Sequence, residues 1–259
     1  MSDLTVTQHA PGIWEMTLQR PERMNALSVA AVAAMRAAVD EASRAGARVM
    51  LIRGTGKAFS AGADLKERQG MDLAGKLAHN QGIRAAIDAV GGARFISIAL
   101  INGLAMGGGL ELALGCDLRL AAAGVQIGLT ESRIGAFPGA GGTQRLPRVI
   151  GASRALQMML LGEPIRSERA LEIGLVNEVV DAEQLLPRGL ELAGQLAARS
   201  APALATIKRL VYQGLELPLS AALQVERAAV PAILASRDYA EGLAAFAEKR
   251  PPRFTDSAD

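Results

Sequence analysis

One segment departs most clearly from ordinary strand and helix patterns: Ala99-Leu-Ile-Asn-Gly-Leu-Ala-Met-Gly-Gly-Gly-Leu-Glu-Leu-Ala-Leu-Gly-Cys-Asp-Leu118. Its apolar start predicts a buried strand, and its second half predicts a helix that carries Glu111. Between them, three consecutive glycines let the backbone approach another group closely. The helix N-terminus that follows presents unpaired N–H groups and the positive end of a dipole. Two interpretations stay open: a site for developing negative charge, or a tight connection whose glutamate faces water.

A second glycine-containing loop, Ser60-Ala-Gly-Ala-Asp64, also follows a predicted strand. Because parallel sheets carry their functional loops at the carboxyl ends of strands, the two loops could each direct one N–H at the same atom. Such a donor pair makes an oxyanion hole, in which each donor contributes about 3–4 kcal/mol. Glu111 and Glu131 offer two carboxylates that could divide acid and base roles. The alternative for Glu131 is a solvated loop residue paired with Arg133.

The composition narrows the class of protein. The 259 residues suffice for one large domain, or for one domain with a helical appendage, and half of them are apolar. The formal net charge is only +2, without a basic block, so no nucleic-acid partner is expected. Cys116 is the single cysteine, which excludes an internal disulfide and favours a reducing, cytoplasmic location. The start of the chain lacks signal-peptide features, and Glu111 interrupts the longest apolar run, so no membrane segment is predicted.

The order of predicted elements indicates an α/β protein. Alternating polar and apolar side chains over residues 13–18 predict a half-buried strand, and Ser28 is predicted to cap a helix over residues 30–45. Continuous apolar runs predict buried strands at residues 49–52, 96–101 and 118–121. Helical segments between these strands imply parallel pairing with right-handed crossovers. Residues 67–80 are poorly periodic and are interpreted as mobile, and the chain beyond Pro147 is predicted to be mostly helical.

The sequence lacks the residue patterns of several common catalytic and binding sites. The two histidines, His9 and His79, are not next to a glycine-rich loop in the sequence, and no Gly-x-Ser-x-Gly elbow is present. The run Gly139-Ala-Gly-Gly-Thr-Gln144 misses the dinucleotide-binding fingerprint at its last glycine. No group of ligating residues has metal-binding spacing, so no metal is expected.

The motifs together resemble those of the enoyl-CoA hydratase/isomerase (crotonase) superfamily, from residue 13 to residue 254. They are Phe59-Ser-Ala-Gly-Ala-Asp-Leu-Lys66, Asn102-Gly-Leu-Ala-Met-Gly-Gly-Gly-Leu-Glu-Leu-Ala113 with Cys116-Asp117, Pro138-Gly-Ala-Gly-Gly-Thr-Gln-Arg-Leu146, Arg20-Pro21 with Asn25-Ala-Leu27, and Ala245-Phe-Ala-Glu-Lys-Arg-Pro-Pro252. The resemblance implies a spiral ββα core over residues 1–200. It also implies a C-terminal helical region over residues 201–259 that forms trimers, often paired into hexamers.

The resemblance also implies site roles. The N–H groups of Ala63 and Gly108 would hold the thioester oxygen, Glu111 would activate a water molecule, and Glu131 would deliver a proton to C2. Coenzyme A belongs to the substrate, and no separate cofactor is implied. The residues that would bind CoA are Arg23, Met24, Ala26, Ala61, Ala63, Asp64, Leu65, Lys66, Phe246 and Lys249. The last two lie where the family's final helix reaches CoA, often that of a neighbouring subunit.

The expected activity is hydration of a short or branched 2-enoyl-CoA thioester, because hydratases of this superfamily carry both glutamates. The alternatives are isomerisation or other enolate chemistry on the same fold, and a non-catalytic CoA-ester or RNA-binding module. Residues 107–148 and 249–254 look especially similar to the 3-methylglutaconyl-CoA hydratase group. Some of that group bind RNA through a lysine-rich first helix, but the corresponding helix here is rich in alanine and has no lysine. Substrate choice is expected to lie in residues 67–93 and in the loop around Ala136 and Phe137. Arg133 is expected either to face a distal acyl carboxylate or to form a surface pair.

Overall fold

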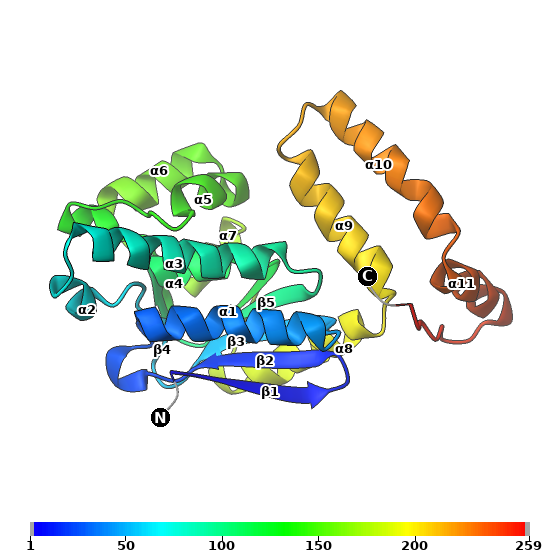
Figure 1. The fold of residues 1–259 in the computed structure, drawn as a ribbon, viewed down its shortest axis with the longest axis horizontal. Coiled ribbons are helices and arrows are strands. Elements are labelled where there is room, and N and C mark those ends of the chain that lie inside the picture. Colours follow the sequence, from blue (N-terminus) through cyan, green and yellow to red (C-terminus); the bar gives the residue numbers. More distant parts are fainter. Residues whose placement is uncertain (1–2, 257–259) are drawn as a thin grey trace.

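The structure, a computed structural model, describes residues 3–256 as a mixed α/β protein (Figure 1). Within this range, the larger sheet has the spatial order β1 (Leu4–Ala10), β2 (Ile13–Leu18), β3 (Val49–Gly54), β5 (Ile96–Ile101), β7 (Leu118–Ala122), β10 (Glu178–Val180). The smaller sheet has the order β4 (Ala58–Ser60), β6 (Leu104–Met106), β8 (Gln126–Gly128), β9 (Ile165–Arg166). Among the strand pairs of residues 3–256, only β1–β2 and β8–β9 are antiparallel. All other pairs are parallel, as the predicted crossovers require.

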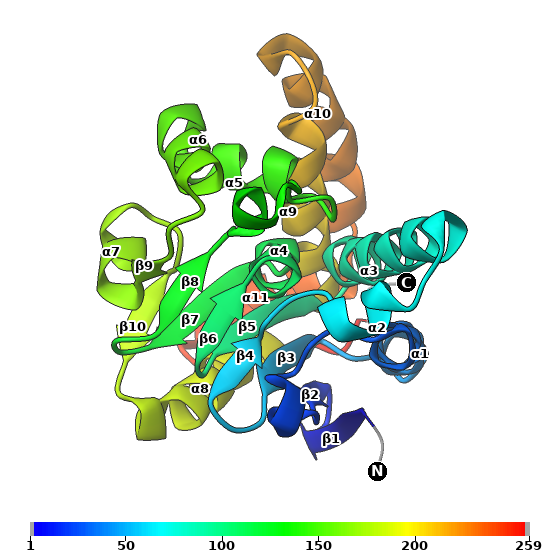
Figure 2. The same cartoon turned by 90° about the vertical axis from the view of Figure 1, so that its left-hand side faces the viewer.

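Helices lie on both faces of the larger sheet. All helices of the described range are α1 (Val29–Arg44), α2 (Leu65–Gln69), α3 (Leu73–Gly92), α4 (Gly108–Gly115), α5 (Gly142–Ile150), α6 (Ala152–Leu161), α7 (Ser167–Glu172), α8 (Leu185–Ala197), α9 (Ala201–Gly214), α10 (Leu219–Leu234) and α11 (Arg237–Glu248), with short 3-10 turns η1 (Pro21–Arg23), η2 (Glu131–Ile134) and η3 (Ala182–Gln184). Helix α1 packs its buried face on one side of the sheet and α8 packs on the other (Figure 2). As predicted, α1 begins after Ser28, whose Oγ accepts the N–H of Ala31 at 3.0 Å.

The core repeats one structural unit along the chain. Each unit gives a strand to the larger sheet, then a strand to the smaller sheet, and then a helix: β3, β4 and α2–α3, then β5, β6 and α4, then β7, β8 and η2–α5. This repeat confirms the spiral ββα core. It also brings the carboxyl ends of β4, β6 and β8 side by side, because these three strands pair in parallel.

Strand β2 differs from the prediction of a half-buried strand, because all six of its residues are buried. Glu15 is one of them, and its carboxylate accepts hydrogen bonds from Thr17 Oγ1, from Arg53 Nε at 2.8 Å and from the ring of His9 at 2.8 Å. Burial alone would raise the pKa of Glu15, but these hydrogen bonds outweigh it and lower the pKa. The alternation of polar and apolar residues therefore does not mark a solvent-exposed face of β2. Both faces are packed, and the carboxylate on the polar face finds its hydrogen-bond partners within the protein.

The segment 67–80 is also more regular than predicted. It contains the end of α2 and the first part of α3, which begins at Leu73 after Asp72. The Asp72 carboxylate accepts the N–H of Gly75 at 2.7 Å and so caps the helix. The apolar residues Leu73 and Leu77 are exposed in this first part of α3. Because this part of the helix has no continuous buried face, its sequence shows no clear helical period of apolar residues.

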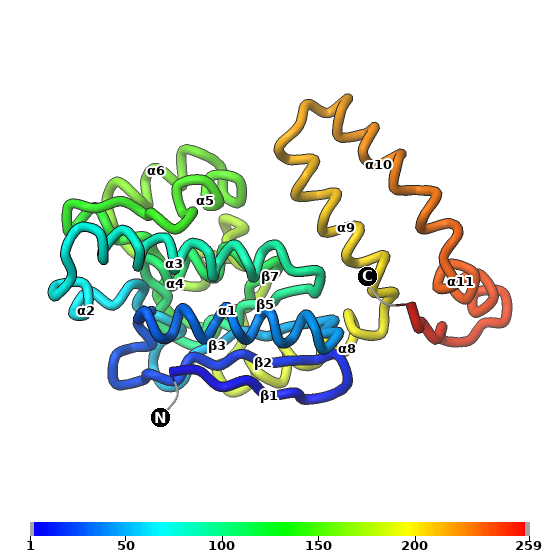
Figure 3. Tube along the Cα trace, in the orientation of Figure 1, coloured from blue at the N-terminus to red at the C-terminus, as the bar shows by residue number. Residues whose placement is uncertain are grey.

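The C-terminal helices extend away from the two sheets (Figures 1 and 3). Helices α9 and α10 pack against each other, and α9 is anchored to the core through Lys208, whose Nζ lies 2.8 Å from Asp117 Oδ2 and 3.0 Å from the carbonyl oxygen of Phe95. The predicted division of the chain at residue 200 stays a prediction. Among the helices of residues 3–256, none is both long enough and apolar enough to cross a membrane.

Candidate active site

A cavity of about 160 Å³ lies at the carboxyl ends of β4, β6 and β8. Four of its lining residues are those predicted for chemistry: Ala63 follows β4, Gly108 and Glu111 follow β6, and Glu131 follows β8. The two loops are predicted to follow strands, and the apolar runs nearest to them are at residues 49–52 and 96–101. In the structure, a further strand of three residues in the smaller sheet precedes each loop, β4 before Ala63 and β6 before Gly108.

The loops that carry Ala63 and Gly108 touch each other through backbone atoms. A Cβ placed on Gly62 would lie 2.8 Å from the backbone nitrogen of Gly108, and one on Gly109 would lie 2.1 Å from the carbonyl oxygen of Ser60. Gly62 also has φ +87, a conformation that residues with side chains rarely adopt. This close approach therefore depends on glycine at both positions.

Two backbone N–H groups at this contact have no acceptor within the described part of the chain, those of Ala63 and Gly108. Ala63 forms an isolated parallel bridge with Leu27, in which Leu27 N donates to Gly62 O at 2.7 Å and Asp64 N donates to Leu27 O at 3.1 Å. In such a bridge the intermediate residue directs its own N–H away from the partner. Gly108 is the first residue of α4, where N–H groups have no partner within the helix.

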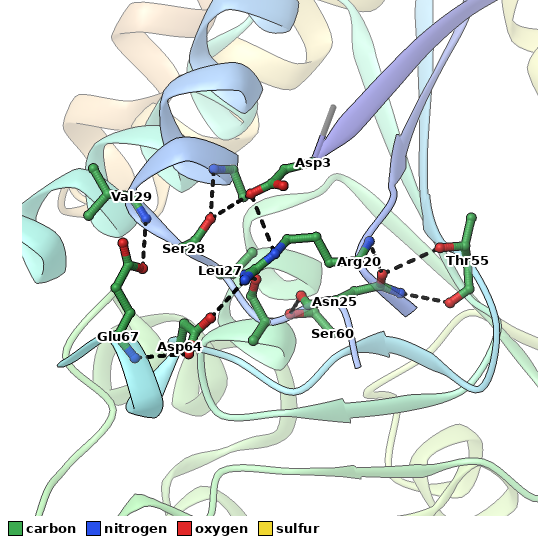
Figure 4. A network of polar contacts seen from close by, with 12 residues as sticks. Asp3, Arg20, Asn25, Leu27, Ser28, Val29, Thr55, Ser60, Asp64 and Glu67 are labelled. Atoms are coloured by element: carbon green, nitrogen blue, oxygen red, sulfur yellow. Dashed lines mark hydrogen bonds and ion pairs between the residues drawn. The ribbon is translucent and has the colours of Figure 1, made fainter. Parts of the chain in front are cut away.

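A buried ion pair fixes the loop that carries Ala63 (Figure 4). Arg20 Nη2 lies 3.0 Å from the carboxylate of Asp64, and the same guanidinium donates to Ala26 O at 2.8 Å and pairs with Asp3 at 3.4 Å. Asp64 also caps α2 by accepting the N–H of Glu67 at 3.1 Å. Burial alone would raise the pKa of Asp64, but the cap and the pair with Arg20 lower it. Asp64 thus remains ionised and holds the loop in place.

Asn25 braces the same loop from the other side (Figure 4). Its buried amide donates to Thr55 O at 2.8 Å and Ala58 O at 2.7 Å, and its side-chain oxygen accepts the N–H of Arg20 at 2.9 Å. Ser60 Oγ donates to Asn25 O at 2.8 Å. These bonds join the segment before α1 to β4, so the loop between β4 and α2 begins from a fixed point.

Glu111 is 3% exposed and is held at one oxygen only. Its Oε1 accepts the N–H groups of Ala140 at 2.7 Å and Gly142 at 2.8 Å. Burial raises the pKa of Glu111, whereas these two N–H groups and the charges of Arg145 and Arg68 act to lower it. Its Oε2 has no hydrogen-bond partner among residues 3–256 and is the oxygen left for chemistry in the cavity.

Glu131 has a less polar environment. Its Oε2 is buried without a hydrogen-bond partner, and no ion pair with Arg133 is formed in the described range. Burial and the nearby charge of Glu111 raise the pKa of Glu131 to about 7. A Cβ on Gly107 would lie 3.0 Å from Glu131 Oε1, so glycine at this position leaves the carboxyl group its space. The solvated, Arg133-paired interpretation of Glu131 is therefore wrong.

Arg68 also lines the cavity, although it was not predicted from the sequence. Its Nε donates to His79 Nδ1 at 3.2 Å, and His79 Nε2 donates to Leu27 O at 2.8 Å. Because a carbonyl oxygen can only accept, this bond places the ring proton on Nε2 and leaves Nδ1 as the acceptor for Arg68. The spacing in the sequence could have indicated this position. Arg68 lies four residues after Asp64, the cap of α2, and is therefore one helical turn beyond the loop. His79 is thus close to the loop in space although distant in sequence.

The predicted CoA-binding residues fall into two groups. The first group flanks the loop before α2, where Ala61 N donates to Met24 O at 2.9 Å. Its members Arg23, Met24, Leu65 and Lys66 are exposed, Ala26 and Ala61 are partly buried, and the Asp64 side chain is buried in its pair with Arg20. The second group, Phe246 and Lys249, lies at the far end of the molecule, since α11 and α2 are at opposite ends in Figure 1. One chain does not bring these two groups together.

Arg133 is exposed and does not line the cavity. A Cβ on Gly162 would lie 2.9 Å from its Cγ, so the side chain begins against the end of α6. Across residues 3–256, no group of three or more histidine, cysteine, aspartate or glutamate side chains is arranged to hold a metal ion.

Comparison with known proteins identifies this arrangement. The enoyl-CoA hydratase/isomerase family model matches residues 8–257. The chain is 37% identical to the mitochondrial methylglutaconyl-CoA hydratase of Mus musculus over 94% of this chain and 79% of that protein, and 37% identical to the enoyl-CoA isomerase/hydratase Fer4 of Mycosarcoma maydis over 94% and 93%. The crystal structure of the enoyl-CoA hydratase from Bacillus anthracis superposes with a TM-score of 0.96 at 37% identity, covering 99% of this chain and all of that one (100%). With the spiral core and the paired loops in place, the chain belongs to the enoyl-CoA hydratase/isomerase family of enzymes and has the crotonase fold.

Proposed function

We propose that this protein is a hydratase of short or branched 2-enoyl-CoA thioesters. The observation that carries the proposal is one small cavity lined by two buried carboxyl groups and by two unpartnered backbone N–H groups. Relatives named as methylglutaconyl-CoA hydratase and as enoyl-CoA isomerase/hydratase support the substrate class. The reaction uses no cofactor beyond the CoA of the substrate. The expected cytoplasmic location stays a prediction.

The N–H groups of Ala63 and Gly108 form the oxyanion hole in this proposal. Attack of water at C3 moves electrons through C2 to the thioester oxygen, where enolate charge develops. Two fixed donors stabilise that charge more than they stabilise the neutral carbonyl group, so they lower the barrier. Their rigidity follows from the glycine contacts between the loops and from the Arg20–Asp64 pair.

Glu111 and Glu131 then act as base and acid. Glu111 has to be ionised for its role, and its Oε2 takes a proton from the water as the water oxygen bonds to C3. Glu131, whose pKa of about 7 keeps a large neutral fraction near neutral pH, gives its proton to C2. The product has gained one water molecule, and transfer of a proton from Glu111 to Glu131 restores the starting states.

Two alternatives share parts of this site. Isomerisation needs one carboxyl group to carry a proton between two carbons and adds no water. A non-catalytic CoA-ester or RNA-binding module would have no use for two carboxyl groups beside the thioester, whose burial raises their pKa values.

Incubation with crotonyl-CoA separates these functions. A hydratase removes the ultraviolet absorbance of the conjugated double bond and yields a product heavier by one water. An isomerase gives a product of unchanged mass from an enoyl-CoA ester that it accepts. Binding without turnover on a panel of crotonyl-, tiglyl-, methylglutaconyl- and longer enoyl-CoA esters would contradict the proposed function.

Arg68 suggests that the preferred acyl group carries a distal carboxylate. Its Nε is held by His79, while no carboxylate of residues 3–256 lies within ion-pair distance of its guanidinium. Burial lowers the pKa of Arg68, so the protein keeps a cation in a partly buried place without an ion pair of its own. A substrate carboxylate would supply the missing partner, through the charge-assisted bonds that a guanidinium favours. Arg133, the candidate from sequence, lies outside the cavity.

Replacing Arg68 by glutamine is therefore expected to lower kcat/KM for methylglutaconyl-CoA by about 10- to 100-fold, the effect of losing one charge-assisted contact. The value for crotonyl-CoA, which has no distal carboxylate, is expected to change much less. Steady-state kinetics with both esters measure this selectivity, and Arg133→Gln is the matched control that should alter neither. An equal loss on both esters would mean that Arg68 acts on Glu111 and does not bind a carboxylate of the substrate.

We further propose that CoA is bound between subunits of a homotrimer or hexamer. The exposed positions of Phe246 and Lys249 at the end opposite α2 support this arrangement, because a second copy must then bring α11 to the CoA of its neighbour. Exposed apolar side chains along α9 and α10, such as Ile207, Val211 and Leu219, provide area for the association. A molar mass in solution equal to one chain would contradict this assembly.

A further inference from the structure

The carboxylate of Glu111 depends on a short turn for its orientation. The N–H groups of Ala140 and Gly142 converge on Oε1, and between them Gly141 has φ +112, in the region that favours glycine. A Cβ on Gly142 would lie 3.0 Å from the same oxygen, so the turn fits closely against the carboxylate. A small displacement of this turn would therefore release Glu111 or rotate it.

Arg145 supports the turn from the side opposite Glu111. Its Nη1 donates to Ala140 O at 3.2 Å, and its Nη2 donates to Asp88 Oδ1 on α3 at 2.6 Å. A Cβ on Gly141 would lie 2.1 Å from Nη1, which shows how closely the guanidinium underlies the turn. The neighbouring peptide is tied to the same helix, because Asn80 Nδ2 donates to Gly139 O at 3.3 Å.

These contacts lie beside a second, larger cavity. It has a volume of about 760 Å³ between α3, α5 and α9, and Asp88, Gly141, Arg145 and Arg148 line it, whereas Glu111 and Glu131 do not. The turn 139–142 thus separates the two cavities: one side meets Glu111 and the other meets Arg145. Arg145 does not line the smaller cavity, so any effect on the reaction passes through the turn or through its charge.

We propose that Arg145, anchored by Asp88, is a positioning residue that holds the Ala140–Gly142 turn and thereby directs Oε2 of Glu111 at the reacting water. The inference rests on the proposed function only in giving Glu111 the role of base. A planar guanidinium suits this task, because its separate N–H groups can bond the turn and α3 at once. The exposed Asp88–Arg145 pair adds little stability by itself, so its contribution is geometric.

The charges around Glu111 determine the pH test. Arg68 faces it from α2, Arg145 from α5 and Glu131 from η2, while Asp88 and Arg84 on α3 lie behind Arg145. Burial raises the pKa of Glu111 and Arg145 acts against that rise. Removal of the positive charge therefore raises the pKa of Glu111 further, so the acid limb of kcat/KM moves to higher pH.

Four variants separate position from charge. Arg145→Gln is expected to lower kcat about 10- to 100-fold with little change in KM, the effect of a misplaced catalytic group, and to move the acid limb to higher pH. Arg145→Lys keeps the charge but not the two-sided contact, so it should lower kcat less and leave the acid limb in place. Asp88→Asn should give a smaller loss in kcat without an upward shift of the limb. Arg148→Gln, in the next turn of α5 and lining the same cavity, is the control and should match the wild type.

Thermal unfolding and circular dichroism show whether each variant is folded. Wild-type kcat and an unmoved acid limb in folded Arg145→Gln would overturn the inference, as would losses of the same size in Arg148→Gln. Should the wild type hydrate no enoyl-CoA ester, the proposed function fails, and the positioning inference is tested by NMR titration of isotope-labelled glutamate. Arg145→Gln then has to raise the pKa of Glu111, and an unchanged titration overturns the inference separately.

Discussion

Glu131→Gln is expected to lower kcat for the hydration of crotonyl-CoA by about 10²- to 10⁴-fold, the usual contribution of a general acid. Glutamine preserves the shape of the side chain, but its amide has no acidic proton that it could deliver to C2. The wild-type carboxyl group is suited to that step because burial and the charge of Glu111 raise its pKa to about 7. Glu111→Gln removes the base and should cause a loss of similar size.

The pH profile follows from the same two groups. Glu131 has to be protonated, so kcat/KM is expected to fall as the pH rises through about 7. Glu111 has to be ionised, so kcat/KM also falls at acid pH, as its carboxylate becomes protonated. The two carboxyl groups interact, and the limbs therefore describe the pair rather than either residue alone.

Steady-state kinetics of both variants measure the loss of hydration, and calorimetry measures their affinity for crotonyl-CoA. The ester should bind to both variants, because the N–H groups of Ala63 and Gly108 remain. Glu163→Gln, at an exposed position after α6, is the control and should retain full activity. Near-full hydration by Glu131→Gln would refute the two-carboxylate mechanism. Isomerisation that persists in Glu131→Gln but is lost in Glu111→Gln would instead favour the single-carboxylate alternative.

Local chemistry explains which features could be predicted from sequence. Ser28 and the start of α4 after Gly107 follow from short-range rules for caps and glycine. The strands β4, β6 and β8 have three residues each, too few to produce a period, although they place every piece of the site. The burial of the polar face of β2 could not be predicted from local sequence either, because hydrogen-bond partners of Glu15 lie on other strands.

The candidate site shows the same division. Ala63 lies on a glycine-containing loop, and Gly108 and Glu111 lie in the first turn of α4, which begins in the glycine run. These glycine patterns are visible in the sequence, and the structure places all three residues at one cavity. Glu131 required the resemblance to a family, because a lone loop glutamate has no distinguishing pattern. Arg68 and Arg145 are held by tertiary contacts with α3, at His79 and Asp88, and no spacing in the sequence reveals those partners.

Gly108→Pro is expected to lower kcat for the hydration of crotonyl-CoA strongly, because it removes one of the two proposed oxyanion donors. Loss of a single donor costs about 2.7–4 kcal/mol, or about 10²- to 10³-fold in kcat. Gly108 is the first residue of α4, the helical position at which proline is best tolerated, because its N–H is not used within the helix. The preceding residue is Gly107, which has no Cβ to collide with the proline ring. The helix should therefore form while the site loses its donor.

Gly108→Ala separates the donor from the space that surrounds it. A Cβ at this position would lie 3.4 Å from both Ala63 N and Gly62 Cα, which is ordinary contact, so alanine should fit and still donate its N–H. Gly109→Ala is a poor control, because its Cβ would lie 2.1 Å from Ser60 O. Hydration kinetics and thermal unfolding of the alanine and proline variants should show similar stability and very different kcat. If the two variants hydrate crotonyl-CoA equally fast, the N–H of Gly108 does not bind the thioester oxygen, and the glycine run serves only the close packing of the loops.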